Sequence, residues 1–303
     1  MTPTLPPPSL GPVLAATDFS APARHATDRA ARLAHETGAA LSLMHVLSGG
    51  ALHELRQWLG TSHATEKQLH DDAQQQLAAA VAELQASRNV TARPVNAVGS
   101  VLKEIAREAE ALDAGLLVLG ARGASFVRRL ALGSTSERLL RRTTRPLLVV
   151  RQRPHEPYRR VLVALDFSPW SEDAIALARR VAPRAHLLLF HAYQVPFEEK
   201  LHFAGVDAAT IDHYRKHSCA DATQRLHAQA AASGLKPGDW VPCIVEGDAS
   251  QRIVEHEQEE DCDLVVLGKH GQSAAEDLLL GSVSKHVLAE GSTDVLVSTA
   301  HDA

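Results

Sequence analysis

The sequence carries one pattern twice, and this repetition limits the possible folds more than any other feature of the chain. VLAATDFS at residues 13–20 recurs as VLVALDFS at 161–168, LVLGARG at 117–123 as VVLGKHG at 265–271, and LGSTS at 132–136 as LGSVS at 280–284. All three pairs share an offset of 148 residues, whereas His45 and His191 are 146 residues apart. We therefore expect two copies of one domain, the second with a shorter connection before its second strand.

Length and proline content suggest where the copies meet. A chain of 303 residues suits two domains of ordinary size better than one. The segment RPHEP at residues 153–157 has two prolines, which discourage regular structure. We expect one domain at residues 1–153, with residues 1–11 as a disordered proline-rich tail, and the other at residues 154–303.

Within each copy, apolar strand patterns alternate with helical ones. The first copy predicts strands at residues 13–17, 40–47, 92–98, 116–119 and 146–150, and helices at 22–36, 65–87, 101–111 and 134–142. The second copy follows the same course and ends with a strand at residues 294–298. Such alternation predicts the α/β class, with a doubly wound five-stranded parallel sheet in each domain. Ligands of such sheets bind beyond the carboxyl ends of the strands, which places Asp18 and Gly120 at one edge.

The loop after the fourth strand has glycines at spacings that suit a phosphate. It reads Gly120-x2-Gly123-x9-Gly133-Ser134-Thr135, and its copy reads Gly268-x2-Gly271-x9-Gly281-Ser282-Val283. Glycine lets the main chain approach a bulky anion, and the helix that begins next presents free N–H groups. No Gly-Lys-Ser/Thr follows, so this is not a Walker loop. The alternative is that one or both loops keep this shape without a ligand.

These features together resemble the universal stress protein family, over nearly the whole chain and in both copies. The resemblance rests on the glycine signature, the Asp-Phe-Ser after the first strand, and the histidine in the second strand. It implies a strand order of 3-2-1-4-5, the fold of the adenine nucleotide alpha hydrolase-like proteins, and ATP binding. The Asp after the first strand and the backbone after the histidine would hold adenosine. The glycine loop and the Ser/Thr that follows it would hold the phosphates. The residues so assigned are Asp18, Val46, Gly120, Gly123, Gly133, Ser134 and Thr135, with Arg122 added in the same loop, and Asp166, Ala192, Gly268, Gly271, Gly281, Ser282 and Val283.

The two loops differ in charge. Residues 120–145 hold seven arginines and one glutamate, whereas residues 268–293 hold two lysines and three carboxylates. Glu276 and Asp277 stand at the positions of Arg128 and Arg129. Carboxylates destabilise a nearby polyphosphate unless a divalent cation such as Mg²⁺ intervenes, so we expect the first copy to bind ATP more tightly. The alternative is that these charges form a solvated face away from the ligand.

Composition excludes several classes of function. A net charge of −5 argues against a nucleic-acid partner, and no apolar run reaches the length of a membrane helix. The odd number of cysteines, without a CxxC pair, and the lack of a signal peptide favour the cytoplasm. His213-x3-His217 fixes no third metal ligand, and Ser282-x-x-Lys285 lacks its companion motifs, so we expect neither a metal site nor a catalytic serine.

We therefore expect an ATP-binding regulatory protein of the stress response, with unknown protein partners. No general base or Mg²⁺ carboxylate is evident, so hydrolysis should be absent or slow. A slow ATP hydrolase and a nucleotide-free interaction module remain the alternatives. The last strands, at residues 146–150 and 294–298, lie at sheet edges, so the repeats are expected to pair there as an intrachain pseudo-dimer, and a homodimer of chains is plausible.

Overall fold

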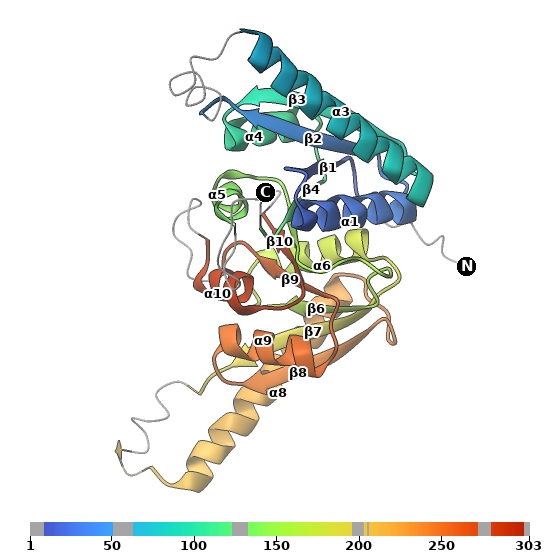
Figure 1. Cartoon of the computed structure of the whole chain (residues 1–303). Helices are drawn as coiled ribbons and strands as arrows, with labels where there is room; N and C mark the ends of the chain where they lie inside the picture. Colours follow the sequence, from blue (N-terminus) through green and yellow to red (C-terminus); the bar gives the residue numbers. More distant parts are fainter. Residues whose placement is uncertain are drawn as a thin grey trace, which may run out of the picture. The chain divides into compact units, whose positions relative to one another are not determined.

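Each half of the chain builds its own sheet from the strands that the hydrophobic pattern predicted. The computed structural model describes residues 9–50, 63–122, 133–195, 203–204, 206–271 and 280–299. The chain divides into two compact units, Met1–Pro157 and Tyr158–Ala303. Figure 1 shows the elements of both, coloured along the sequence.

In the described residues of the first unit, five parallel strands lie in the order β3-β2-β1-β4-β5. This order confirms the 3-2-1-4-5 prediction. The elements are β1 (Val13–Ala16), α1 (Ala21–Thr37), β2 (Leu41–Ser48), α3 (His63–Arg88), β3 (Ala92–Gly99), α4 (Val101–Ala111), β4 (Leu116–Gly120), α5 (Ser134–Arg142) and β5 (Leu147–Val150).

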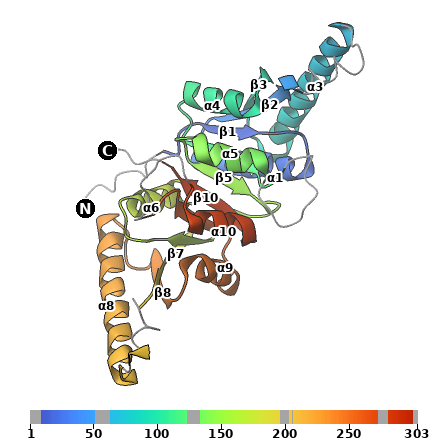
Figure 2. The same cartoon turned by 90° about the vertical axis from the view of Figure 1, so that its left-hand side faces the viewer.

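The second unit repeats this arrangement, with its strands in the order β8-β7-β6-β9-β10. Its elements are β6 (Arg160–Ala164), α6 (Trp170–Val181), β7 (His186–Tyr193), α8 (Ala208–Ala232), β8 (Trp240–Glu246), α9 (Ala249–Glu259), β9 (Leu264–Gly268), α10 (Ser282–Glu290) and β10 (Asp294–Ser298). Helices α9 and α10 pack against each other (Figure 2).

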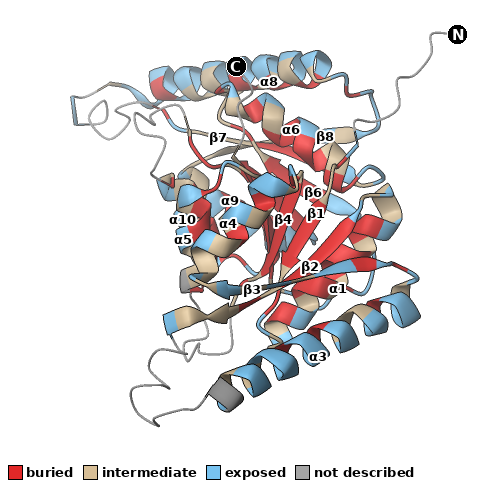
Figure 3. Cartoon of the chain, turned by 90° about the horizontal axis from the view of Figure 1, so that it is seen from above, coloured by how far each residue is buried: buried red, intermediate tan, exposed pale blue. Residues whose placement is uncertain are grey.

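Helices cover both faces of the first sheet because its central strands are apolar throughout. In β4, Leu116, Leu117 and Val118 are at most 1% exposed, as expected for a parallel strand buried on both sides. Helix α1 packs on α3, and α4 packs on α5. Figure 3 shows the buried strands of this unit between these two helix pairs. The arrangement leaves the carboxyl edge of the sheet to the loops.

Local sequence sets the ends of α1. The Ser20 hydroxyl accepts a hydrogen bond from the Ala23 N–H at 3.3 Å and caps the first turn. Gly38 ends the helix at a φ of 73°, in the left-handed region that glycine adopts without strain. Ser20 and Gly38 thus flank the helix that the sequence predicted at residues 22–36.

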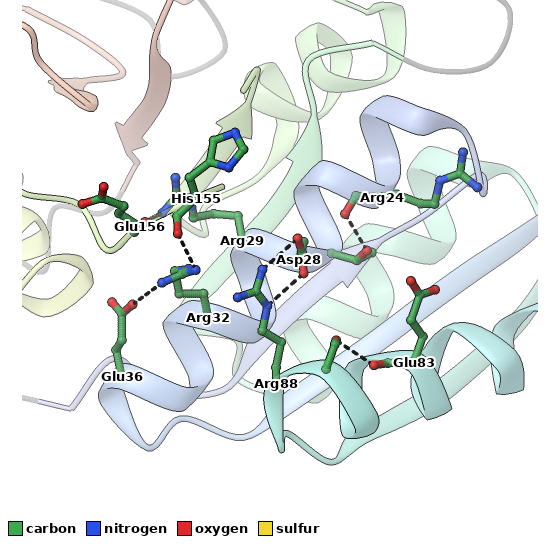
Figure 4. A network of polar contacts seen from close by, with 11 residues as sticks. Arg24, Asp28, Arg29, Arg32, Glu36, Glu83, Arg88, His155 and Glu156 are labelled. Atoms are coloured by element: carbon green, nitrogen blue, oxygen red, sulfur yellow. Dashed lines mark hydrogen bonds and ion pairs between the residues drawn. The ribbon is translucent and has the colours of Figure 1, made fainter. Parts of the chain in front are cut away.

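Arginines of α1 hold the chain segment that ends the first unit (Figure 4). Arg29 donates to the carbonyl of Glu156 at 2.9 Å, and Arg32 donates to that of His155, also at 2.9 Å. Arg29 is only 6% exposed, and a charge buried to this degree needs hydrogen bonds of this kind to offset the cost of its burial. The segment 155–156 therefore packs on α1 of its own unit.

The start of the first unit is also packed. Leu10 lies within the tail predicted at residues 1–11, but its side chain is 2% exposed. A methyl carbon placed on Gly115 would lie 1.9 Å from the Leu10 carbonyl oxygen, so only glycine fits there. The folded part thus includes Leu10, because an apolar side chain next to the first strand finds a place in the core.

Candidate functional site

The ligand edge of the first unit is the carboxyl edge of its sheet, where β1 and β4 end side by side. Ala15 of β1 lies opposite Val118 of β4, so the loops that follow begin at the same level. Asp18 is exposed in the loop after β1, and one of its carboxylate oxygens accepts from the Ser20 N–H at 3.1 Å. The structure thus brings Asp18 to the edge at which β4 ends with Gly120, as the sequence predicted.

A stacked pair of rings fixes the loop after β1. Phe19 has a φ of 61°, and its ring stacks on His45 of β2 with centroids 4.4 Å apart. His45 Nδ1 lies 2.8 Å from the Thr17 carbonyl oxygen, which can only accept, so this nitrogen carries the proton. The histidine has a structural role, and it places the main chain of Val46 beside this loop.

The second unit has the same ring pair with one addition. The rings of Phe167 and His191 lie 4.2 Å apart, and His191 Nδ1 lies 2.8 Å from the Leu165 carbonyl oxygen. The Arg225 guanidinium lies over the Phe167 ring, 4.3 Å from its centroid. Burial, followed by the charge of Arg225, lowers the pKa of His191, partly offset by its hydrogen bond to Leu165.

The first glycine of each loop is required by a close approach of main chains. A methyl carbon on Gly120 would lie 2.9 Å from the Pro22 carbonyl oxygen in the first turn of α1. The Gly133 N–H donates to the Ala121 carbonyl at 2.8 Å, and the Ser136 hydroxyl donates to the Gly120 carbonyl at 3.1 Å. These bonds hold the start of α5 against the end of β4.

The second unit repeats these loop contacts. The Gly281 N–H donates to the Lys269 carbonyl at 3.0 Å, and the Ser284 hydroxyl donates to the Gly268 carbonyl at 2.8 Å. The N-cap residues of α5 and α10 are Gly133 and Gly281, which carry no side chain that could cap the helix. The first N–H groups of both helices are therefore not engaged by their own N-caps.

A cavity of about 540 Å³ opens at the ligand edge of the first unit. It lies where β2 and β3 end and where α4 and α5 begin, so two helix N-termini face it. The N-cap residue of α4, Ser100, makes no side-chain capping bond. The lining consists of Ser48, Gly49, Gly50, Gly99, Ser100, Val101, Leu102, Thr135 and Arg138.

The cavity has the chemistry of an anion site. Of the lining residues that the structure describes, Arg138 is charged, and the others offer hydroxyls, main chain or apolar groups. Of the residues predicted from the sequence, Thr135 lines it, whereas Asp18 and Gly120 lie on the same edge outside its lining. The sequence interpretation missed Ser100 and Arg138, although Arg138 belongs to the basic stretch that it noted.

The second unit has different residues at the positions that correspond to Ser100 and Arg138 of the cavity. At the offset of 148, Ser100 is replaced by Asp248 and Arg138 by His286. The Asp248 carboxylate accepts from the N–H groups of Ser250 and Gln251 at 3.0 and 3.2 Å and caps α9. Hydrogen bonds from Ser250, and to a smaller extent the proximity of His286, lower the pKa of Asp248. The second unit thus places a carboxylate where the first has an uncharged hydroxyl.

Ion pairs engage part of the positive charge that the sequence assigned to the first loop. Arg145 pairs with Glu110 at 2.8 Å and with Asp113 at 2.5 Å. Arg141 pairs with Glu137 at 2.8 Å. These two arginines are thus engaged by carboxylates of α4 (Glu110), of the turn after it (Asp113) and of α5 (Glu137).

Some predicted positions lie outside the described residues. These are Gly123, Arg128, Arg129, Glu276 and Asp277, and the side chain of Ser134 is also not described. Among the described residues, no group of three His, Cys, Asp or Glu side chains is placed to hold a metal ion. No helix in that part of the chain has the length and apolar character of a membrane span.

Comparisons with known proteins agree with the duplication. The sequence model of the universal stress protein family matches residues 10–151 and again residues 157–299. A universal stress protein of Mycobacterium tuberculosis H37Rv is 32% identical over 199 residues, which cover 64% of this chain and 63% of that relative. A second one from the same strain is 30% identical over 192 residues, covering 60% and 58%. The matched regions thus span less than two thirds of these relatives.

Solved structures show the same fold over nearly the full chain. The crystal structure of a universal stress protein from Archaeoglobus fulgidus has a TM-score of 0.68 at 19% identity and covers 95% of this chain and 98% of its own. A functionally unknown protein from Pseudomonas aeruginosa PAO1 has a TM-score of 0.60 at 18% identity, covering 95% and 92%.

Proposed function

Because this chain belongs to the universal stress protein family through both of its halves, we propose that it binds an adenine nucleotide, ATP above all, at the ligand edge of its first unit. It then acts as a regulatory protein of the stress response, and nucleotide binding biases its conformation and its choice of protein partners. A ligand can do this only through different affinities for two conformations.

The cavity beside Thr135 is the observation that carries this proposal. Its volume of about 540 Å³ falls in the range of small-molecule sites, and Arg138 and two helix N-termini give it the polarity that a phosphate group requires. In this proposal Gly133, Ser134 and Thr135 hold phosphates, Asp18 holds the ribose, and the Val46 main chain holds the adenine edge.

Side-chain differences support a stronger site in the first unit. The cavity residues Ser100 and Arg138 favour an anion, whereas Asp248 brings negative charge to the matching place in the second unit. A carboxylate there repels a phosphate unless a cation such as Mg²⁺ lies between them.

The same cavity favours binding over chemistry. Among the described residues of its lining there is no carboxylate and no histidine, so none of these side chains is suited to act as a general base toward water. We therefore expect ATP to be held with slow hydrolysis at most.

Isothermal titration of the full chain with ATP, with and without Mg²⁺, tests this function. Arg138→Gln should weaken ATP binding about ten- to hundredfold, because a hydrogen bond to a charged group is lost. Arg141→Gln is the matched control, since Arg141 lies one turn further along α5 and pairs with Glu137. If the unaltered chain releases no heat with ATP, or if both variants bind alike, the proposed site is wrong.

A further inference from the structure

The aspartate that follows the first strand has different hydrogen-bond donors around it in the two units. In the second unit, one oxygen of the Asp166 carboxylate, Oδ1, accepts three hydrogen bonds: from the Ser168 N–H at 3.0 Å, from the Ser168 hydroxyl at 2.6 Å and from the Ser171 hydroxyl at 3.1 Å. A carboxylate oxygen has about two lone-pair directions, so three donors fill the capacity of Oδ1.

The other oxygen of Asp166 faces the glycine loop. A methyl carbon placed on Gly271 would lie 2.9 Å from Oδ2, so the carboxylate lies directly against the main chain of this loop. A sugar hydroxyl that approached Oδ2 from this side would need the space beside the Gly271 main chain. Oδ1 of Asp166 is thus committed to the protein's own donors, and Oδ2 lies against Gly271.

Ser171 is the residue that sets this arrangement. Its hydroxyl also accepts from the Asp166 N–H at 3.3 Å, so it bridges the main chain and the carboxylate of the same aspartate. Ser168 and Ser171 are 5% and 3% exposed, and their hydrogen bonds to Asp166 are therefore shielded from competing water.

The first unit has no hydroxyl at the corresponding place. At the offset of 148, Ser171 is replaced by Ala23 and Ser168 by Ser20. The Ser20 hydroxyl accepts from the Ala23 N–H and caps α1, while Asp18 is exposed at the ligand edge. The same Asp-Phe-Ser motif therefore carries an exposed carboxylate in one unit and, in the other, a partly buried carboxylate that accepts from two serine hydroxyls.

We propose that Ser171 is a positioning residue that closes the second ligand edge by holding Asp166 against Gly271, and that Ala23 keeps the first edge open. This inference rests on the proposed function, because it concerns the carboxylate that would accept from the nucleotide's ribose. The chain then binds one ATP tightly for each two-domain molecule, because the Ser171 hydroxyl withholds Asp166 in the second copy, where Asp248 already disfavours the phosphates.

Reciprocal substitutions in the full chain test this assignment by isothermal titration with ATP and Mg²⁺. Ala23→Ser should lower the ATP affinity about tenfold, since the new hydroxyl competes for Asp18. Ala23→Cys is the matched control, because it adds a group of similar size with only a weak donor. Thermal unfolding of both variants checks that they are folded.

The converse variant, Ser171→Ala, should add a second, weaker ATP site. Its control is Ser292→Ala, which removes another hydroxyl that donates to a carboxylate, that of Glu257, near the amino end of β10. Equal ATP affinity in the two Ala23 variants, or one ATP per chain in Ser171→Ala, overturns the role of Ser171. Absence of ATP binding by the unaltered chain instead overturns the proposed function, and the inference with it.

Discussion

Gly120→Ala is expected to damage both the stability of the first unit and its ligand edge. The added methyl carbon would lie 2.9 Å from the Pro22 carbonyl oxygen, 3.0 Å from the Pro22 carbonyl carbon and 3.1 Å from the Arg122 carbonyl oxygen. All three are main-chain atoms, so none can move aside by a change of rotamer. Either the first turn of α1 or the end of β4 must shift.

Overpacking of this kind costs about 1–3 kcal/mol of unfolding free energy. For a domain of about 150 residues, each kcal/mol lowers Tm by about 2–4 °C, so the unit should melt about 2–12 °C lower. The shift separates the α1 turn after Asp18 from the glycine loop. ATP affinity should therefore fall more than the loss of stability alone explains.

Calorimetric unfolding and ATP titration of the full chain measure the two effects. Gly50→Ala is the control for stability, because its methyl carbon would meet nothing closer than the Ser48 hydroxyl at 3.7 Å, an ordinary contact. If Gly120→Ala melted within about 1 °C of the unaltered chain and bound ATP equally well, the packing argument for this glycine would be refuted.

Two further predictions concern titratable groups of the second unit. Burial lowers the pKa of His191 below its ordinary 6.5, so the unfolded chain binds a proton more readily and stability falls as the pH drops from about 6.5 through the lower folded pKa. His191→Gln, which can still donate to the Leu165 carbonyl, should flatten this slope in urea titrations at several pH values; an unchanged slope would contradict the assignment. Burial also raises the pKa of Cys262 to about 12 and that of Cys243 to about 11. Both thiols should resist iodoacetamide at pH 8 until the unit unfolds, as peptide mass spectrometry would detect, and rapid labelling of the native chain would argue against their burial.

The sequence was sufficient for the architecture because its signals are local and occur twice. Apolar runs such as β4 reveal a strand buried on both faces, and the alternation with helices then permits few topologies. The order of the strands placed Asp18 and Gly120 at one edge without any knowledge of side-chain contacts. The glycines were also informative, since Gly120 is required by a neighbouring main chain.

Contacts between distant segments were less predictable. Seven arginines in a stretch suggested a basic loop, but Arg145 is paired with carboxylates of the α4 region that no local pattern connects to it. The cavity was missed for the same reason, since Ser100 and Arg138 meet only when α4 and α5 pack together. The Asp-Phe-Ser motif looked identical in both copies, and the hydroxyl that separates them lies three residues beyond it, at Ser171.

The hydrogen bonds from α1 to the carbonyl groups of residues 155 and 156 affect where a fragment of the first repeat should end. The family match of this repeat stops at residue 151, before the two carbonyl groups that receive Arg29 and Arg32. A fragment cut at that point would remove the Glu156 carbonyl that accepts from Arg29, a side chain only 6% exposed. The compact unit runs through Pro157 and so extends beyond the end of the family match at residue 151.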